Sequence, residues 1–198
     1  MIEIKSIDNP QVLSDICELL HKSQKTETEN TGVLFNTIRL QPEELKEEIE
    51  QKNGQCICAL EDGRVLGSLC VFPDNKNRWY TQDKRCLEIK YVGVSPESQG
   101  KHIGSSLINY VKAWPNYDII NVSTGEKNLN AISFYKKNDF LIVDFSRGPI
   151  HNACKLAYWK GECPIKQSVI RSHVLLSKMK CIVKKLLVRP KVSKDSFQ

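Results

Sequence analysis

The chain of 198 residues is 40% hydrophobic and 26% charged, ordinary values for a globular protein that argue against a disordered or fibrous one. Its net charge of +6 comes from residues 150–198, which carry 11 Lys and Arg against 2 Asp and Glu, whereas residues 1–149 carry 18 against 21. A basic tail on a mildly acidic body is weaker evidence for nucleic-acid binding than a basic domain would be, so we expect no nucleic acid as a partner.

The N-terminal part of the chain predicts one strand and two helices. Residues 2–7 (IEIKSI) alternate apolar and polar like a strand, and Asp8 or Asn9 then offers a helix cap. The polar stretch KSQKTETENTG, at 22–32, follows as a loop of the kind that often borders a binding site. A second, acidic helix is expected within residues 41–54.

A β-hairpin and an alternating pattern follow. Asp62 and Gly63 supply the positive φ angles of a tight turn between strands at 56–60 and 65–72. The next elements are predicted as strands at 85–94, 118–124 and 140–145 and helices at 102–114 and 131–138. This alternation indicates an α+β or mixed α/β fold with helices on the faces of the sheet.

The sequence after Phe145 is ambiguous. Residues 152–160 (NACKLAYWK) and 169–178 (VIRSHVLLSK) are both candidates for the last strand, and we favour the second. The residues from 147 to 167 would then form a long loop near the site. The stretch LLSKMKCIVKKLLV also has the apolar spacing of a basic amphipathic helix, so strand and helix signals overlap there.

Eight cysteines and four histidines raise the questions of disulfides and metal. Several cysteines lie inside apolar strand patterns and no CxxC pair occurs, so we expect buried, reduced thiols. Cys56 and Cys58 lie two apart on a strand and should share one face as core residues. His21, His102, His151 and His173 do not cluster in sequence, and we expect no metal.

The stretch VGVSPESQGKHIGSSL, from Val92 to Leu107, runs from a strand through a turn into a helix. Such a turn collects unpaired backbone N–H groups and the positive end of the helix dipole at one point. Gly100 and Gly104 allow close approach and Lys101 adds positive charge, which suits a pyrophosphate. A solvated strand-to-helix turn without a ligand is the alternative.

This stretch resembles the cofactor motif of the GNAT superfamily of acyl-CoA N-acyltransferases, in which Gln99 and Gly104 match the ends of the motif and His102 replaces its middle glycine. The segment NLNAISFYKKNDF, at 128–140, resembles a second GNAT motif, although Asp139 stands where that motif has a glycine. Two motifs in order, separated by the expected strand, are far less probable by chance than either alone.

The resemblance implies a GNAT fold, with a central mixed, largely antiparallel sheet of six to seven strands flanked by helices. It extends from residue 2 to about residue 178, with specific motifs between 86 and 140. We therefore expect an acetyltransferase domain at 1–178 and a basic C-terminal tail at 179–198.

The resemblance also implies acetyl-CoA as a co-substrate. In the GNAT fold two neighbouring strands splay apart and pantetheine lies in the gap. Here that assigns the backbone of Val92, Gly93 and Val94 to pantetheine. The amides assigned to the pyrophosphate are those of Gln99, Gly100, Lys101, His102, Ile103, Gly104 and Ser105. Gly93 in mid-strand is consistent with a bulge or a close approach.

Amine acylation requires a proton for the departing thiolate and a base for the amine. Tyr135 stands in the family's FY position and resembles the general acid; a tyrosine packed on the sheet is the alternative. Asn128 and Ala131 match the motif that contacts the cofactor.

Glu88 is the candidate base. It precedes Val92 by four residues on one strand, so its side chain should project from the same face as Lys90, Val92 and Val94. GNAT members that use a glutamate base carry it at this position. A glutamate paired to a lysine, or deprotonation through a chain of waters, are the alternatives.

The sequence thus predicts an acetyl-CoA-dependent N-acetyltransferase that transfers the acetyl group directly to a primary amine of a small amine, an aminoglycoside-like compound, a peptide or a protein. A GNAT-fold domain that binds CoA or regulates without turnover is the alternative. A role of the tail at a nucleic acid or a membrane surface is a third hypothesis, but we expect no membrane partner.

Residues near the acceptor are less defined. Glu27 and Glu29 could attract a cationic acceptor from the predicted loop. Four aromatic residues expected in loops could lie on the acceptor side, or be core or dimer contacts: Trp79, Tyr80, Tyr158 and Trp159. No apolar run approaches the roughly 18 residues of a membrane span and the N-terminus lacks a signal-peptide pattern, so we expect a cytoplasmic protein, monomeric or homodimeric.

Overall fold

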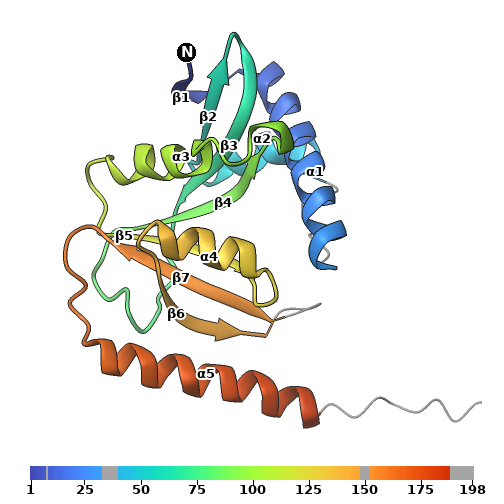
Figure 1. Ribbon diagram of the computed structural model, residues 1–198. Helices are drawn as coiled ribbons and strands as arrows, with labels where there is room; N and C mark the ends of the chain where they lie inside the picture. The colour runs from blue at the N-terminus through green and yellow to red at the C-terminus, as the bar shows by residue number, and fades with distance from the viewer. Residues whose placement is uncertain (8, 33–39, 148–151, 188–198) are drawn as a thin grey trace, which may run out of the picture.

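The computed structural model describes residues 1–7, 9–32, 40–147 and 152–187. It contains one seven-stranded sheet in the order β1-β2-β3-β4-β5-β7-β6, flanked by helices (Figure 1). Neighbouring strands are antiparallel except β4 and β5, which are parallel. Asp8, His151 and the end of the predicted tail lie outside the described residues.

The strands are β1 (Glu3–Ile7), β2 (Gln55–Glu61), β3 (Arg64–Pro73), β4 (Cys86–Val94), β5 (Ile119–Gly125), β6 (Leu141–Ser146) and β7 (Ala153–Trp159). The helices are α1 (Pro10–Thr31), α2 (Pro42–Gln51), the 3₁₀ turn η2 (Pro96–Ser98), α3 (Ile103–Lys112), α4 (Leu129–Lys137) and α5 (Gln167–Leu187). The predicted hairpin is confirmed, with Asp62 and Gly63 at φ 50° and 80° between β2 and β3.

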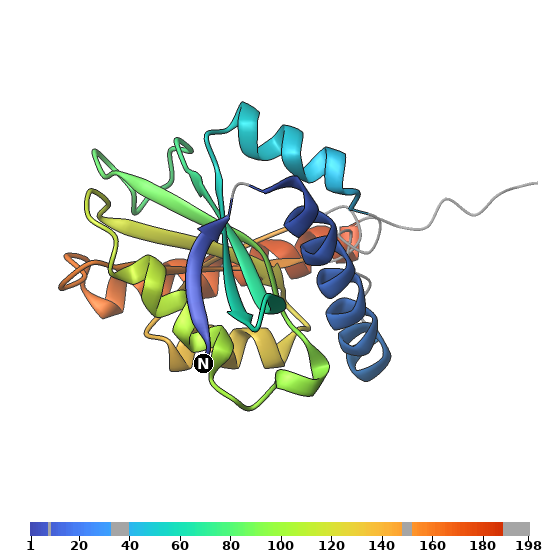
Figure 2. The same ribbon diagram turned by 90° about the horizontal axis from the view of Figure 1, so that it is seen from above.

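Helices cover both faces of the sheet (Figure 2). On one face, α3 and α4 pack over a core that includes Ile57 and Ala59 of β2. On the other face, Cys56 and Cys58 of the same strand pack with α1 and α2. This alternation follows from the two-residue period of a strand, and it confirms that Cys56 and Cys58 share a face.

The loop predicted at 22–32 is wrong, because α1 continues to Thr31. The stretch is polar, but it contains neither glycine nor proline before Gly32, so nothing in it stops a solvent-exposed helix. Gly32 ends the helix at φ 67° and its N–H donates to the carbonyl of Thr28. Asn9 caps the start, accepting a hydrogen bond from the N–H of Gln11.

The favoured last strand is also wrong. Residues 153–159 form β7, which lies between β5 and β6, whereas residues 169–178 belong to α5. Cys154, Leu156, Ala157 and Trp159 of β7 are all buried, so this strand lacks the polar alternation that marks a half-exposed strand. α5 continues through residue 178 to Leu187, and the predicted domain boundary at that residue stays a prediction.

The expectation that all cysteines are reduced is wrong for one pair. Cys56 and Cys70 lie opposite each other in β2 and β3 and form a disulfide. The strand pattern of the sequence could not predict which residues the hairpin register brings together. Six cysteines are free in the described residues, five of them buried.

None of the helices that the structure describes is both long enough and apolar enough to span a membrane.

Candidate functional site

The sheet is irregular in β4. Ser68 of β3 is opposite Gly93, but Cys70 is opposite Lys90, so β4 has one more residue than β3 between these pairs. This is a β-bulge at Tyr91 and Val92, and Tyr91 has a left-handed backbone with φ 54°. A Cβ at Gly93 would lie 2.8 Å from Leu19 Cδ2, so the absence of a side chain there lets α1 approach the strand.

The bulge accompanies an opening of the sheet. β4 and β5 pair only from Cys86 opposite Ile119 to Ile89 opposite Val122. Beyond Ile89, β4 continues to Val94 and β5 continues to Gly125 without pairing to each other. In Figure 1, β4 runs away from β7 toward α1. The end of β4 therefore has a backbone edge that another amide-containing group could pair with.

The turn after β4 presents several amides at one place. The N–H groups of Gly100 and of residues 102–105 donate to no acceptor within the described part of the chain. They stand at the N-terminus of α3, where the helix dipole is positive, and Lys101 is exposed beside them. The arrangement can hold a phosphate or pyrophosphate group through its backbone.

His102 occupies the N-cap of α3 with φ 60° and ψ 11°, a left-handed conformation. Gly100 has φ 80°, so the turn places two residues in the region that favours glycine. Gly104 has another role, since a Cβ there would lie 3.1 Å from ring atoms of Phe134. The absence of a side chain at Gly104 lets α3 approach α4 closely.

The second motif forms α4. The side chain of Asn128 caps the helix by accepting a hydrogen bond from the N–H of Ala131 at 3.0 Å. Tyr135 is buried against the core between the sheet and α3, and its ring lies edge-to-face on Phe140. Burial raises the pKa of the Tyr135 phenol above its usual value, which keeps the group protonated at neutral pH.

Glu88 is surrounded by cations. Its carboxylate lies 3.0 Å from Lys76 Nζ and 3.9 Å from both Arg78 Nη2 and Lys90 Nζ. The side chain is 15% exposed. The lysine pairing that the sequence left open as an alternative is therefore present.

The expectation that Glu88, Val92 and Val94 share a face is wrong. Lys90 Nζ lies 2.9 Å from Glu48 of α2, so this side of β4 faces α2. Val92 and Val94 instead pack against the core under α3 and α4. The bulge adds one residue to β4 between Lys90 and Gly93. It therefore turns Val92 and Val94 to the face opposite the one on which Glu88 and Lys90 lie.

A buried polar network holds the loop before β4, and no sequence motif indicated it. Asp74 accepts hydrogen bonds from Arg78 Nη1 and from Asn121 Nδ2 of β5 at 3.0 Å. The hydroxyl of Tyr80 donates to Asn121 Oδ1 at 3.2 Å. This network places Arg78 beside Glu88. No local sequence pattern could indicate this network, because Asp74 and Asn121 are far apart in the chain.

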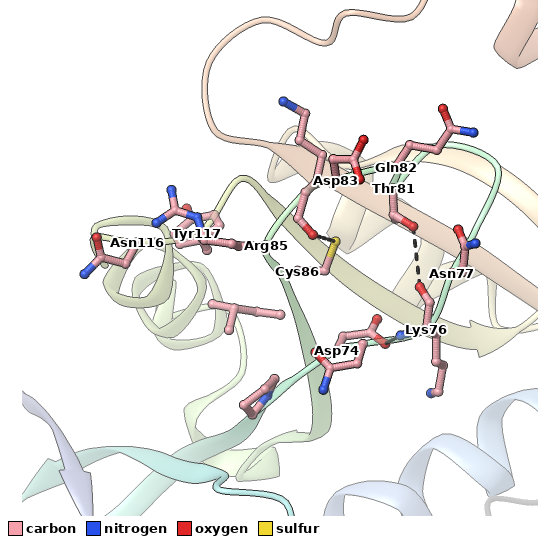
Figure 3. A pocket seen from close by; sticks show the side chains of 14 residues that line it. Asp74, Lys76, Asn77, Thr81, Gln82, Asp83, Arg85, Cys86, Asn116 and Tyr117 are labelled. Atoms are coloured by element: carbon pink, nitrogen blue, oxygen red, sulfur yellow. Dashed lines mark hydrogen bonds between the residues drawn. The ribbon is translucent and has the colours of Figure 1, made fainter.

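A pocket of about 900 Å³ opens at the first residues of β4 (Figure 3). Its lining includes charges of both signs, such as Asp83, Lys84 and Arg85, and none of the predicted cofactor residues. Lys76, which pairs with Glu88, is part of the lining. The pocket therefore adjoins the predicted base and is separate from the amide-rich turn after β4.

The residues expected near the acceptor lie in helix α1, in the loop between β3 and β4 and in β7. Glu27 and Glu29 belong to α1, and Glu27 accepts a hydrogen bond from Asn130 Nδ2 of α4 at 3.3 Å. Tyr80 and Trp159 are buried in a core cluster with Trp79 packed against it. Tyr158 and Trp159 belong to β7 rather than to a loop. For these aromatic residues the core alternative is favoured.

The family model described as "Acetyltransferase (GNAT) family" matches residues 18–140, which is more than half of the chain. The chain belongs to the GNAT acetyltransferase family. This confirms the resemblance drawn from the two motifs. Among curated proteins, none matches the chain.

Solved GNAT structures have the same fold. The PaiA N-acetyltransferase of Thermoplasma acidophilum in complex with coenzyme A aligns at TM-score 0.63 and 17% identity, over 80% of this chain and 99% of that one. An aminoglycoside 6'-N-acetyltransferase complexed with coenzyme A aligns at TM-score 0.60 and 16% identity, over 82% and 99%. An N-acetyltransferase of Staphylococcus aureus Mu50 aligns at TM-score 0.60 and 18% identity, over 82% of this chain and 99% of that one. These similarities confirm the predicted GNAT fold.

Proposed function

We propose that the protein transfers the acetyl group of acetyl-CoA directly to a primary amine. The observation that carries this proposal is the combination of unpaired amides at the start of α3 with the opening between β4 and β5. The unpaired amides suit a pyrophosphate, and the opening between the strands suits the amide-containing pantetheine arm. Two structurally similar proteins are described in complex with coenzyme A, which supports the same cofactor here.

In the proposed complex, the backbone around Val92, Gly93 and Val94 pairs with pantetheine. The unpaired amides of Gly100 and of residues 102–105 hold the pyrophosphate, with Lys101 adding positive charge. The N–H groups of Gln99 and Lys101, which the sequence also assigned to it, donate to the carbonyls of Pro96 and Ser98 instead. Asn128 and Ala131 at the start of α4 lie beside the cofactor. His102 takes part through its backbone N–H. Its side chain is exposed and therefore does not fill the turn or cover this N–H.

The chemistry follows from one acid and one base. The amine nitrogen attacks the thioester carbonyl carbon, the carbon–sulfur bond breaks, and Tyr135 gives its phenolic proton to the departing thiolate. The amine proton passes to the Glu88 carboxylate, directly or through water, and returns to the Tyr135 phenolate through solvent. The products are an amide and free CoA, and no covalent enzyme intermediate forms.

The positions of the two groups support this division. Tyr135 lies in the core between the sheet and α3, whereas Glu88 faces the opposite side of β4, toward Lys76 and α2. The opening between β4 and β5 begins at Lys90, two residues after Glu88. In this proposal the thioester lies in the opening, where it is reached from both faces of the sheet.

The amine acceptor belongs to the pocket at the first residues of β4 in this proposal, because Lys76 links that pocket to Glu88. The relatives named as N-acetyltransferases, one of them acting on aminoglycosides, support an amine as the acceptor class. The alternative of a CoA-binding domain without turnover rests on the two replaced glycines. His102 and Asp139 adopt left-handed backbones at those positions, which weakens this alternative.

The test is to incubate the purified protein with acetyl-CoA and a panel of a polyamine, an aminoglycoside and a lysine-containing peptide, and to measure release of free thiol. Turnover is expected with at least one amine, and Tyr135→Phe is expected to lower it by about 100-fold or more. Calorimetry should show that Tyr135→Phe still binds acetyl-CoA, because the change removes only a hydroxyl.

Tyr110→Phe is the matched control, since Tyr110 lies on α3 outside the proposed acid position and packs against the same core. It should leave turnover unchanged. Full activity of Tyr135→Phe would refute the acid assignment, and failure of the wild-type protein to bind acetyl-CoA would refute the cofactor. Binding without thiol release would identify the non-catalytic alternative.

A further inference from the structure

Helix α5 attaches to the domain through one face. Ile170, Ser177 and Cys181 are buried there. The hydroxyl oxygen of Ser177 accepts a hydrogen bond from the N–H of Phe145 in β6 at 3.1 Å. His173 stacks on Trp79 with ring centroids 4.3 Å apart. These contacts fix the orientation of the helix on the sheet.

The opposite face of α5 is apolar and exposed. Its members share large apolar side chains that are 49% to 61% exposed: Val169, Leu175, Leu176, Met179, Ile182 and Val183. Isolated exposed apolar residues are common on proteins, but a contiguous group of this kind marks an interaction surface. We call these six residues the apolar stripe.

Helical geometry explains the grouping. At about 100° per residue, the stripe falls within an arc of about 140° centred opposite Ile170. On the same helix, Arg171 falls at one border of the stripe and Lys180 at the other, whereas Lys178 Nζ lies over the ring of Phe145 in β6. A stripe bordered by cations on both sides is the arrangement of helices that lie in the surface of a membrane.

The charge of α5 selects among possible partners. The helix contains five Lys and Arg and no Asp or Glu. Two copies of the helix packed through their stripes would bring like charges together, which opposes self-association. A nucleic acid would use the cations but would leave the apolar stripe in water. An anionic lipid surface satisfies both features, since headgroups meet the cations and acyl chains meet the stripe.

We propose that α5 binds the surface of an anionic membrane with its stripe in the headgroup region and with Arg171 and Lys180 among the phosphates. This replaces the expectation that no membrane is a partner, and it does not depend on the acetyltransferase proposal. Figure 1 shows α5 as the outermost element beyond β6, so the stripe can reach a flat surface. The helix lies in the interface and does not cross it, in agreement with its hydropathy.

The experiment is cosedimentation of the full chain with vesicles of phosphatidylcholine, with and without 30% phosphatidylserine. Wild-type protein should bind the anionic vesicles at least 10-fold more tightly than the neutral ones. The triple variant Leu176→Gln, Met179→Gln, Ile182→Gln should lose binding to anionic vesicles by at least 10-fold. Because these side chains are exposed, its melting temperature should stay close to that of the wild type.

A second variant separates charge from apolar insertion. Arg171→Gln with Lys180→Gln should weaken binding to anionic vesicles and reduce its dependence on salt. Leu129→Gln is the control, because Leu129 is 70% exposed on α4 and lies outside the stripe. It should bind vesicles like the wild type.

Three results would overturn the proposal. The first is failure of the wild-type protein to bind anionic vesicles at low salt. The second is binding that the triple variant keeps and salt abolishes, since this would be adsorption by charge alone. The third is a wild-type dimer that the triple variant converts to a monomer, since the stripe would then be an interface between copies.

Discussion

At the scale of single residues, His102 is held in a conformation that glycine adopts more easily. Its φ of 60° brings Cβ close to the following carbonyl oxygen, which costs roughly 1–2 kcal/mol for an L-residue. Asp139 has φ 63° at the other position where the family motif has glycine. At both positions the chain thus adopts, without glycine, a backbone conformation that glycine adopts more easily.

We predict that His102→Gly raises the free energy of unfolding of the unliganded protein by about 1 kcal/mol, because it relieves this strain. Urea denaturation measures the change. Acetyl-CoA affinity, measured by calorimetry, should rise if the Cβ keeps the amides from the pyrophosphate and stay the same if it does not.

Lys101→Gly is the control for this prediction. Lys101 precedes His102 but has no left-handed backbone, so glycine there should destabilise the protein by about 0.5–1 kcal/mol through added freedom of the unfolded chain. Equal effects of the two changes would show that the φ angle of His102 carries no cost.

The positions of single residues in the fold could be predicted where a motif identifies them. Gln99, Asn128 and Tyr135 were located from two short patterns, and the structure places them in the turn and in α4. Asp74 and Asn121 could not be found in this way. Their hydrogen bond joins a loop to a strand 47 residues away, and only the fold brings them together.

At the scale of elements, the bulge in β4 decides which side chains lie together. Without it, Glu88, Val92 and Val94 would share a face, as the alternation of a strand predicts. With it, Glu88 faces α2 while the valines face α3 and α4. Gly93 is consistent with a bulge, but the sequence does not specify its place or its effect on the side chains, since these depend on the number of residues in the neighbouring strand.

The contact between α2 and β4 depends on Glu48. Burial alone would raise the pKa of its carboxyl group, but hydrogen bonds from Lys52, Tyr91 and Lys90 outweigh burial and lower the pKa to about 2. A carboxylate with a lowered pKa in the folded state stabilises the protein fully above its unfolded-state pKa, near 4.5. The stabilisation is lost as the pH falls from there toward 2.

We therefore predict that Glu48→Gln destabilises the protein at pH 6 and does so less at pH 3. The free energy of unfolding from urea denaturation at each pH measures this. Glu47→Gln is the control, because Glu47 is exposed on the same helix and forms no ion pair within the described residues. If the difference between wild type and Glu48→Gln did not shrink on acidification, the ion-pair account of this contact would be wrong.

At the scale of the whole molecule, the sheet is two parts joined by a short parallel ladder. β1 to β4 form one part and β5 to β7 the other, and four residue pairs connect them. The network of Asp74, Arg78 and Asn121 crosses the same junction. It connects the two parts through side chains in addition to the four paired residues.

We predict that Asp74→Ala lowers the free energy of unfolding by about 3 kcal/mol, since it removes the nearest carboxylate of the buried Arg78 and leaves the Asn121 amide group without this acceptor. The Asp74 side chain is 1% exposed and that of Arg78 is 13% exposed. Thermal or urea unfolding measures the loss. Gln82→Ala, at an exposed position of the same loop, should change stability by less than about 0.5 kcal/mol.

The sequence by itself determined the family, the order of most elements and the two family motifs, because these depend on local spacing and on residue types that nearby backbone geometry requires. The tertiary structure decided what depends on distant neighbours: the pairing of β7 between β5 and β6, the face on which Glu88 lies, the Cys56–Cys70 pair and the exposed side of α5. Each of these follows from register and packing between segments far apart in the chain, and no local pattern specifies them.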